Sequence, residues 1–429
     1  MNEIIPQFES IVGSTGIYAW EDIDVPQQKQ ALQAIAPGTH PQCIVYPNTQ
    51  AELAEVIACA YHHKACILPR GNGSKLSWGG LGEDILVVVS TKRLNQLIQH
   101  AVGDLTVTVE AGTKFAALQD TLAQERQFLA LDPTAPESAT LGGIVATSDT
   151  GSWRQRYGGV RDQLLGISFV RADGKIAKAG GRVVKNVAGY DLMKLLTGSY
   201  GTLGVITQVT FRVYPLPETS ATVVLTGTKE AITQATTTLR TSALTPTAAD
   251  LISNQLVERL SIGQGLGLVT RFQSIKKSVV EQSTQILAIG EHLSLQGTFY
   301  SDGNEANLWQ KLRSQIGTAT TESEITCKIG VIPSQAVAIV AQMEVGLIHA
   351  GSGLGWLWWE NAQMRDVLEM RSLCQSHGGF LTVLEAPITL KQQMDTWGYT
   401  GNALNVMRHV KQQFDHKNIL SPGRFVDGI

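Results

Sequence analysis

The sequence predicts an α+β protein with more than one domain. Its 429 residues exceed what one hydrophobic core usually serves, so we expect two or three domains. Up to Pro217, short apolar strands and helical segments are mixed with glycine-rich stretches, and from Ala221 strands alternate with helices. A hydrophobic content of 43%, a charged content of 17% and 42 glycines are typical of a folded, turn-rich chain.

Composition excludes several classes of protein. A net charge of −3 provides no basic surface for nucleic acid. No apolar run approaches the roughly 20 residues of a membrane-spanning helix, and the first residues do not resemble a signal peptide. We therefore expect a cytoplasmic protein that reaches a membrane only through partners. The five cysteines are an odd number with no CxxC spacing, which argues against disulfides, zinc and iron–sulfur clusters.

The first elements lead into a glycine-rich turn. Thr49 and Glu52 have the spacing of a capping box, which predicts a helix with Leu53 and Val56 on its apolar face. The apolar run 65–68 then predicts a strand, followed by the glycine-rich stretch 69–80.

This stretch, PRGNGSKLSWGG, has the composition of a dinucleotide-binding turn. Without a Cβ, Gly71 and Gly73 allow positive φ and let successive amides face one concavity, which suits a pyrophosphate. An ordinary glycine turn is the alternative. The stretch lacks the third glycine of G-x-G-x-x-G and the lysine spacing of a P-loop, so it does not predict a Rossmann domain.

Two further glycine-rich stretches follow. Strands are expected at 85–90 and 105–109, with a helix capped by Thr113 and reaching about Ala123. The second stretch runs from 131 to 162, and a hairpin of strands 166–171 and 175–179 comes after it. The third covers 185–206 and leads into a strand that ends before Pro215.

Five motifs in this order resemble a known family. They are PRGNGS, SATLGG, RYGGVRD, KNVAGYD and GTLGVIT, and they resemble the FAD-binding domain of vanillyl-alcohol oxidase and p-cresol methylhydroxylase relatives. Within that family, the likeness is greatest to FAD-binding subunits of glycolate oxidase (glycolate dehydrogenase). It implies four segments: a leader (1–36), a two-subdomain FAD-binding domain (37–217), a cap domain (218–400) and a C-terminal helix and turn that return to the flavin domain (401–429).

The resemblance also implies which residues bind FAD. The amides of the first turn would bind the pyrophosphate, the second stretch would line the flavin and ribityl chain, and the third would hold the adenosine. Some of these glycines could instead only shape turns. No histidine lies between Pro69 and Gly80, so we expect non-covalent FAD. The implied residues are, in these three groups, Arg70, Gly71, Asn72, Gly73 and Ser74; Asp132, Ser138, Gly142, Gly143 and Thr147; Val205 and Ile206.

The second half predicts a ferredoxin-like cap. Its order of strand, helix, two strands, helix and strand is typical of a ferredoxin-like unit, or of a pair of such units sharing one sheet. The pattern alone supports only an α+β domain. Helices are expected at 229–241 and 274–287 and another ending near 316, and strands at 223–225, 248–252, 266–271 and 293–299.

The catalytic candidates are His349 and Glu385. Related 2-hydroxy-acid dehydrogenases carry H-x-G-D-G-N-x-H and a later E-H-G, which hold a divalent metal. Here the first segment keeps His349 but has Ser352 for the aspartate and Trp356 for the second histidine, and the later one keeps only Glu385. We therefore predict no bound metal, and weak or absent hydroxy-acid oxidation by this chain alone. His349 could act as a base, or simply pack beside the neighbouring tryptophans.

The resemblance implies a flavin enzyme with partners. We expect an FAD-binding subunit that oxidises glycolate to glyoxylate, as in photorespiration, beside a paralogous flavoprotein subunit and an iron–sulfur subunit. The alternatives are a stand-alone flavin-dependent oxidoreductase acting on another alcohol, and a non-catalytic assembly subunit. Arg154, Arg156 and Arg161 could bind a carboxylate, a phosphate or an acidic partner, or lie in a solvated loop.

Overall fold

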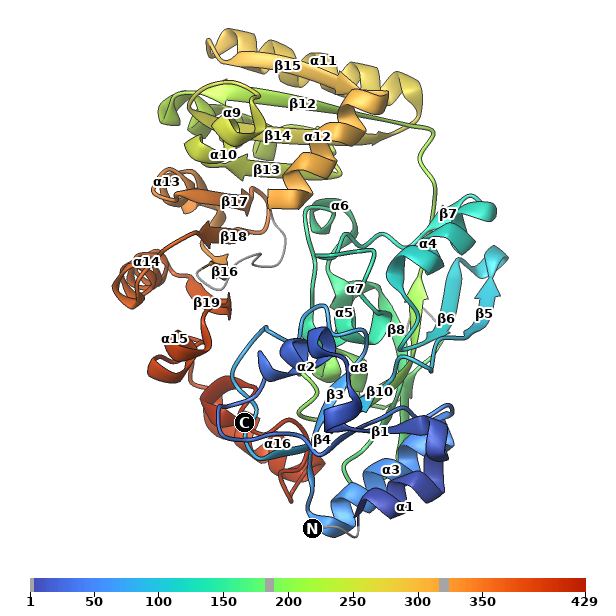
Figure 1. Cartoon of the computed structure of the whole chain (residues 1–429). Coiled ribbons are helices and arrows are strands. Elements are labelled where there is room, and N and C mark those ends of the chain that lie inside the picture. Colours follow the sequence, from blue (N-terminus) through green and yellow to red (C-terminus); the bar gives the residue numbers. More distant parts are fainter. Residues whose placement is uncertain (1–3, 182–188, 316–323) are drawn as a thin grey trace. The chain divides into compact units, whose positions relative to one another are not determined.

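The computed structural model describes residues 4–181, 189–315 and 324–429, and the chain divides into two compact units (Figure 1). The first unit is made of residues 1–149, 159–215 and 391–429, and the second of residues 150–158 and 216–390. The start of the KNVAGYD motif, at 185–188, lies outside the described residues. The four segments implied by the family resemblance stay a prediction.

A four-stranded sheet opens the first unit, with strand order β1-β2-β4-β3. β2, β4 and β3 are parallel, and β1 is antiparallel to β2. Successive side chains of a strand point to opposite faces, so Ile67 packs with α1 and α3, whereas Leu68 packs with α2. The elements are α1 (Ile4–Val12), β1 (Ile17–Ala19), α2 (Val25–Leu32), β2 (Cys43–Val45), α3 (Gln50–His63), β3 (Cys66–Arg70) and β4 (Ile85–Ser90).

A five-stranded antiparallel sheet follows, with strand order β5-β6-β10-β8-β9. Apolar side chains from its central strands form one core with α4 and α5. The elements are β5 (Leu97–Ala101), β6 (Thr106–Glu110), α4 (Phe115–Gln124), β7 (Gln127–Phe128), α5 (Leu141–Thr147), α7 (Val160–Gln163), β8 (Leu164–Val170), β9 (Ile176–Gly180), α8 (Leu192–Leu196), β10 (Val205–Arg212), β11 (Tyr214–Pro215) and, near the C-terminus, α16 (Leu404–Phe414).

The sequence predicted the N-cap residue of α3 correctly and that of α4 wrongly. The Thr49 hydroxyl caps α3 by accepting from the Glu52 amide at 3.1 Å, as predicted. The predicted cap at Thr113 is wrong, because the N-cap residue of α4 is Lys114 and no side chain caps that helix.

One eight-stranded sheet runs through the second unit, in the order β15-β12-β14-β13-β17-β18-β16-β19 (Figure 1). Its first four strands, numbered along the chain, lie in the order 4-1-3-2, and the other four in the order 2-3-1-4. Each half is therefore a ferredoxin-like unit, and β13 pairs with β17 where the halves join. This confirms the predicted α+β class and the predicted pair sharing one sheet.

The helices of the second unit follow the same repeat. α10 was not predicted, since it inserts seven residues between two strands expected to be adjacent. The elements are α6 (Arg154–Tyr157), β12 (Thr219–Gly227), α9 (Lys229–Thr241), β13 (Ala248–Ile252), α10 (Asn254–Leu260), β14 (Leu266–Ser274), α11 (Lys276–His292), β15 (Gln296–Ser301), α12 (Asp302–Gln315), β16 (Ile325–Gly330), α13 (Ala336–Val340), β17 (Val345–His349), β18 (Leu354–Trp359), α14 (Met364–Ser376) and β19 (Phe380–Glu385); α15 (Ile388–Gln393) lies at the boundary between the units.

Candidate functional site

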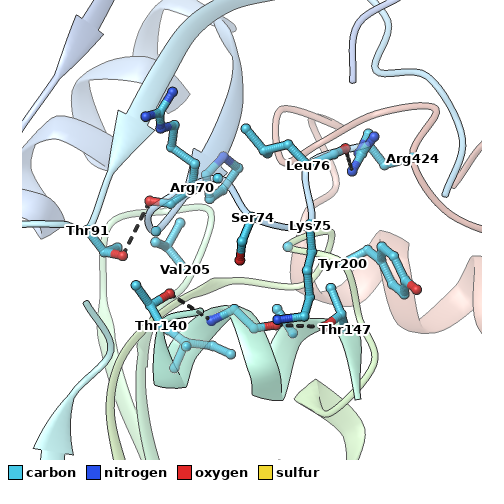
Figure 2. A pocket seen from close by; sticks show the side chains of 18 of the residues that line it. Arg70, Ser74, Lys75, Leu76, Thr91, Thr140, Thr147, Tyr200, Val205 and Arg424 are labelled. Atoms are coloured by element: carbon cyan, nitrogen blue, oxygen red, sulfur yellow. Dashed lines mark hydrogen bonds between the residues drawn. The ribbon is translucent and has the colours of Figure 1, made fainter. Parts of the chain in front are cut away.

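A pocket in the first unit gathers most of the predicted cofactor residues (Figure 2). Its walls come from the turn after β3, from α5, from the turn before β10 and from Arg424. Predicted residues lining it are Arg70, Gly71, Gly73, Ser74, Gly142, Gly143, Thr147, Val205 and Ile206. The pocket therefore joins parts of all three glycine-rich stretches, as expected of a site for one extended ligand.

The glycines of the turn are there because a side chain would not fit. A Cβ on Gly71 would lie 2.1 Å from the Thr140 hydroxyl oxygen, and Gly73 has a φ of +85°. Thr140 is itself fixed, because it caps α5 by accepting from the Gly143 amide. The backbone of the turn at Gly71 therefore packs against the Thr140 side chain at the start of α5. The glycines of the turn and of α5 leave main-chain atoms exposed to the pocket.

Three predicted cofactor residues do not line the pocket: Asn72, Asp132 and Ser138. The side-chain amide of Asn72 instead donates from Nδ2 to the Ser138 carbonyl at 3.2 Å. This hydrogen bond joins the first glycine-rich stretch to the second, so these two residues hold the walls of the pocket together.

Sequence reasoning missed several residues of the wall, including Lys75, Thr140, Tyr200 and Arg424. The Lys75 ammonium nitrogen lies 3.1 Å from an Asp149 carboxylate oxygen, and both side chains are buried. Burial raises the pKa of Tyr200, so its phenol stays protonated. Lys75 could have been found by its place inside the first stretch, and Arg424 by its place in the C-terminal turn.

The C-terminal segment completes the wall. The Ile67 amide donates to the Ile419 carbonyl, and the Ser421 amide donates to the Ile67 carbonyl, so the segment lies along β3. Arg424 then donates to the carbonyls of Leu76, Trp78 and Gly80 at 2.7 to 2.8 Å. Burial lowers the pKa of Arg424 to about 10.

The residues of the pocket fit FAD. Arg70 is buried, and its Nε and Nη1 atoms have no hydrogen-bond partner among the described residues. The Arg70 guanidinium donates to Gln27 of α2, and in Figure 2 it extends away from Ser74 and Thr140, so the groups that suit an anionic pyrophosphate are the glycine amides of the turn. At the opposite end, Tyr200 packs edge-on against Trp397, with ring centroids 4.9 Å apart. Aromatic walls of this kind suit a flat ring system.

A buried polar cluster lies in the second unit. Asp250 accepts from the Ser152 hydroxyl at 2.5 Å, and its other carboxylate oxygen lies 2.6 Å from Nδ1 of His349. A carboxylate only accepts hydrogen bonds, so the proton of this contact belongs to His349 Nδ1. His349 is 3% exposed, and its Nε2 has no hydrogen-bond partner among the residues described. Such an oriented imidazole has the arrangement of a general base.

Glu385 is not a neighbour of His349 in the sheet. β18 and β16 separate their strands, so β17 and β19 are about 14 Å apart. Glu385 pairs with Thr326 at the far end of β16, whereas His349 continues the register that pairs Ile348 with Gly355. The structure therefore gives these two candidates no common site. Across residues 4–181, 189–315 and 324–429, no three His, Cys, Asp or Glu side chains form a group that could hold a metal ion.

The tryptophans after His349 belong mainly to the sheet. Trp356 and Trp359 are buried, and the rings of Trp356 and Trp358 stack with centroids 6.5 Å apart. They lie on β18, which pairs with β17, so these tryptophans contribute to the packing of the sheet.

Similarity to known proteins supports the assignment of this pocket to FAD. Residues 41–180 match the family described as "FAD binding domain". The glycolate oxidase subunit GlcD of Bacillus subtilis is 24% identical, over 90% of this chain and 88% of its own length. A D-lactate dehydrogenase of Archaeoglobus fulgidus is 26% identical, over 89% and 91%.

Solved structures share the fold. p-Cresol methylhydroxylase superposes with a TM-score of 0.75 at 16% identity, over 99% of this chain and 96% of its own. Alkyldihydroxyacetonephosphate synthase gives a TM-score of 0.74 at 16% identity, over 98% and 86%. Among the described residues, no helix is both long and apolar enough to span a membrane.

Proposed function

Because this chain is an FAD-dependent oxidoreductase with an FAD-binding domain and the fold of p-cresol methylhydroxylase, we propose that it is the FAD-binding subunit of a glycolate dehydrogenase complex. The observation that carries the proposal is the convergence of three glycine-rich stretches on one pocket. The similarity to a glycolate oxidase subunit over most of both chains supports the choice of substrate. FAD is held non-covalently, since no histidine lies in the turn 69–80.

The reaction removes a proton and a hydride from a 2-hydroxy acid. A base takes the hydroxyl proton, and a hydride leaves the carbon that carries this hydroxyl group. Glycolate thereby becomes glyoxylate. Bound FAD supplies the acceptor for that hydride. In this chain the candidate base is His349, because Asp250 holds its Nδ1 proton and leaves the Nε2 lone pair without a partner among the described residues.

Partners complete the activity. The chain keeps one histidine of the metal-binding motif, and Glu385 lies at the far end of the sheet from it. We infer that glycolate oxidation depends on a paralogous flavoprotein subunit, with electrons leaving through an iron–sulfur subunit, and that the complex is cytoplasmic. The same motif losses leave two alternatives, a stand-alone dehydrogenase for another alcohol and a non-catalytic assembly subunit.

The test is product formation by the native complex, isolated through a tag on this chain. Glycolate should yield glyoxylate with an artificial electron acceptor, faster than D-lactate or D-2-hydroxyglutarate is oxidised. A complex that oxidises only one of the other two acids would show that the chain serves a different 2-hydroxy-acid dehydrogenase. A chain that purifies alone and oxidises an alcohol would support the stand-alone alternative.

A further inference from the structure

Lys75 places a buried cation in the wall of the FAD pocket. Its side chain is 4% exposed and that of Asp149 is 1% exposed. The Asp149 carboxylate also accepts from the amide and the hydroxyl of Thr134, at 2.8 and 3.2 Å. Lys75 Nζ makes no directed hydrogen bond with any described residue, so its contact with Asp149 is an ion pair that leaves donors unused. The ammonium also lies 5.8 Å from the centroid of the Trp78 ring, so Asp149 and Trp78 stabilise its charge while its hydrogen-bond donors stay available to a ligand.

The position of Lys75 indicates which part of FAD it meets. In Figure 2 its side chain extends toward Thr147, at the end of the pocket that also holds Tyr200 and Arg424. Thr91, Arg70 and Val205 are drawn at the other end. Tyr200 brings an aromatic ring to the Lys75 end, whereas the bare glycine turn suits the phosphates. The Lys75 end therefore fits the flavin ring better than the pyrophosphate.

We propose that Lys75 is an electrostatic positioning residue for the flavin ring, and that Asp149 limits its effect. Reduction by hydride brings two electrons and one proton, so it adds negative charge to the ring. An ammonium in a dry wall stabilises such charge without reorganising, and an adjacent carboxylate offsets part of that effect. The proposal deepens the proposed function but depends only on bound FAD, and not on the choice of glycolate.

The test uses charge changes of opposite sign in the FAD-loaded chain. Sulfite serves as the probe, because it adds to oxidised flavin and leaves a negative charge on the ring. Lys75→Met should raise the sulfite dissociation constant at least tenfold and make the midpoint potential more negative. Asp149→Asn should lower the dissociation constant and make the potential more positive. Lys175→Met, at a side chain that is 77% exposed, is the matched control and should change neither.

Other outcomes would overturn the proposal. If Lys75→Met weakens FAD binding but leaves sulfite affinity and potential unchanged, Lys75 holds the pyrophosphate instead. If both single variants shift sulfite affinity in the same direction, the pair is merely structural. Should Lys75→Met fail to fold, Asp149→Asn alone decides, since the amide oxygen can still accept from Thr134. Neither readout requires turnover, so an error in the assigned substrate would not affect them.

Discussion

Asp250 and His349 face each other across β13 and β17, where the two halves of the eight-stranded sheet join. The carboxylate is completely buried and the imidazole is 3% exposed. Ser152, from the short segment 150–158, donates to the same carboxylate. The Asp250 side chain therefore connects both ferredoxin-like halves with a segment that residues 159–215 separate from them in the sequence.

Replacing Asp250 by alanine should therefore destabilise the second unit. The change would leave His349 Nδ1 and the Ser152 hydroxyl buried without a partner, at a cost of about 3 kcal/mol in the free energy of unfolding. Urea unfolding followed by tryptophan fluorescence measures it. Ser152→Ala removes one contact and should cost about 1 kcal/mol. Equal losses in the two variants would mean that Asp250 does not join these groups.

Gly71→Ala should weaken FAD binding without unfolding the chain. Its new Cβ would meet the Thr140 hydroxyl at 2.1 Å, so the turn must move away from α5. We expect FAD affinity to fall about tenfold or more, as measured by titration of the apoprotein. Gly103→Ala is the matched control, since a Cβ there has no neighbour within 4 Å. Unchanged affinity in Gly71→Ala would separate this turn from the FAD site.

Arg424→Met should destabilise the first unit. Arg424 donates to three carbonyls of the segment 76–80, which methionine would leave buried without donors. The loss should be about 3 kcal/mol or more. Arg408→Met removes an exposed ion pair with Asp427 and should cost less than about 1 kcal/mol. Similar unfolding midpoints for the two variants would contradict the role given to Arg424.

The buried thiol of Cys43 should make stability fall at alkaline pH. Burial raises its pKa to about 12, against 9.0 for an ordinary thiol. Between these values the unfolded chain loses the proton and the folded chain keeps it, so the stabilisation present below pH 9.0 is lost as pH rises toward 12.

Cys43→Ala isolates this effect. From pH 9.5 to 10.5, wild-type stability should fall about 1 kcal/mol more than that of the variant. Parallel curves of unfolding free energy against pH would show that the thiol is not shielded.

The sequence predicted the parts of this protein whose signals are local. Glycine spacing located the turn 69–80. In the second half, where strands alternate with helices, the sequence predicted β13 and α9 with the bounds that the structure gives. Resemblance to a family supplied nine of the residues that line the pocket. The resemblance could not show that Asn72 binds the Ser138 carbonyl instead of lining the pocket, because that depends on how two distant loops pack.

Long-range contacts account for what the sequence did not predict. Arg424 reaches the pocket because the C-terminal segment lies along β3, more than three hundred residues earlier in the chain. His349 and Glu385 match two motif positions, yet the strand order places His349 on β17 in the middle of the sheet and Glu385 on the edge strand β19. Asp250 became a candidate only when the structure paired β13 with β17.

The most direct test is the visible spectrum of the purified chain, alone and within its native complex, before and after anaerobic addition of glycolate. We expect a yellow chain whose flavin band persists with glycolate when the chain is alone and bleaches within the complex. Bleaching of the isolated chain would contradict its dependence on a partner. A colourless chain that takes up no added FAD would show that this pocket does not hold a working flavin.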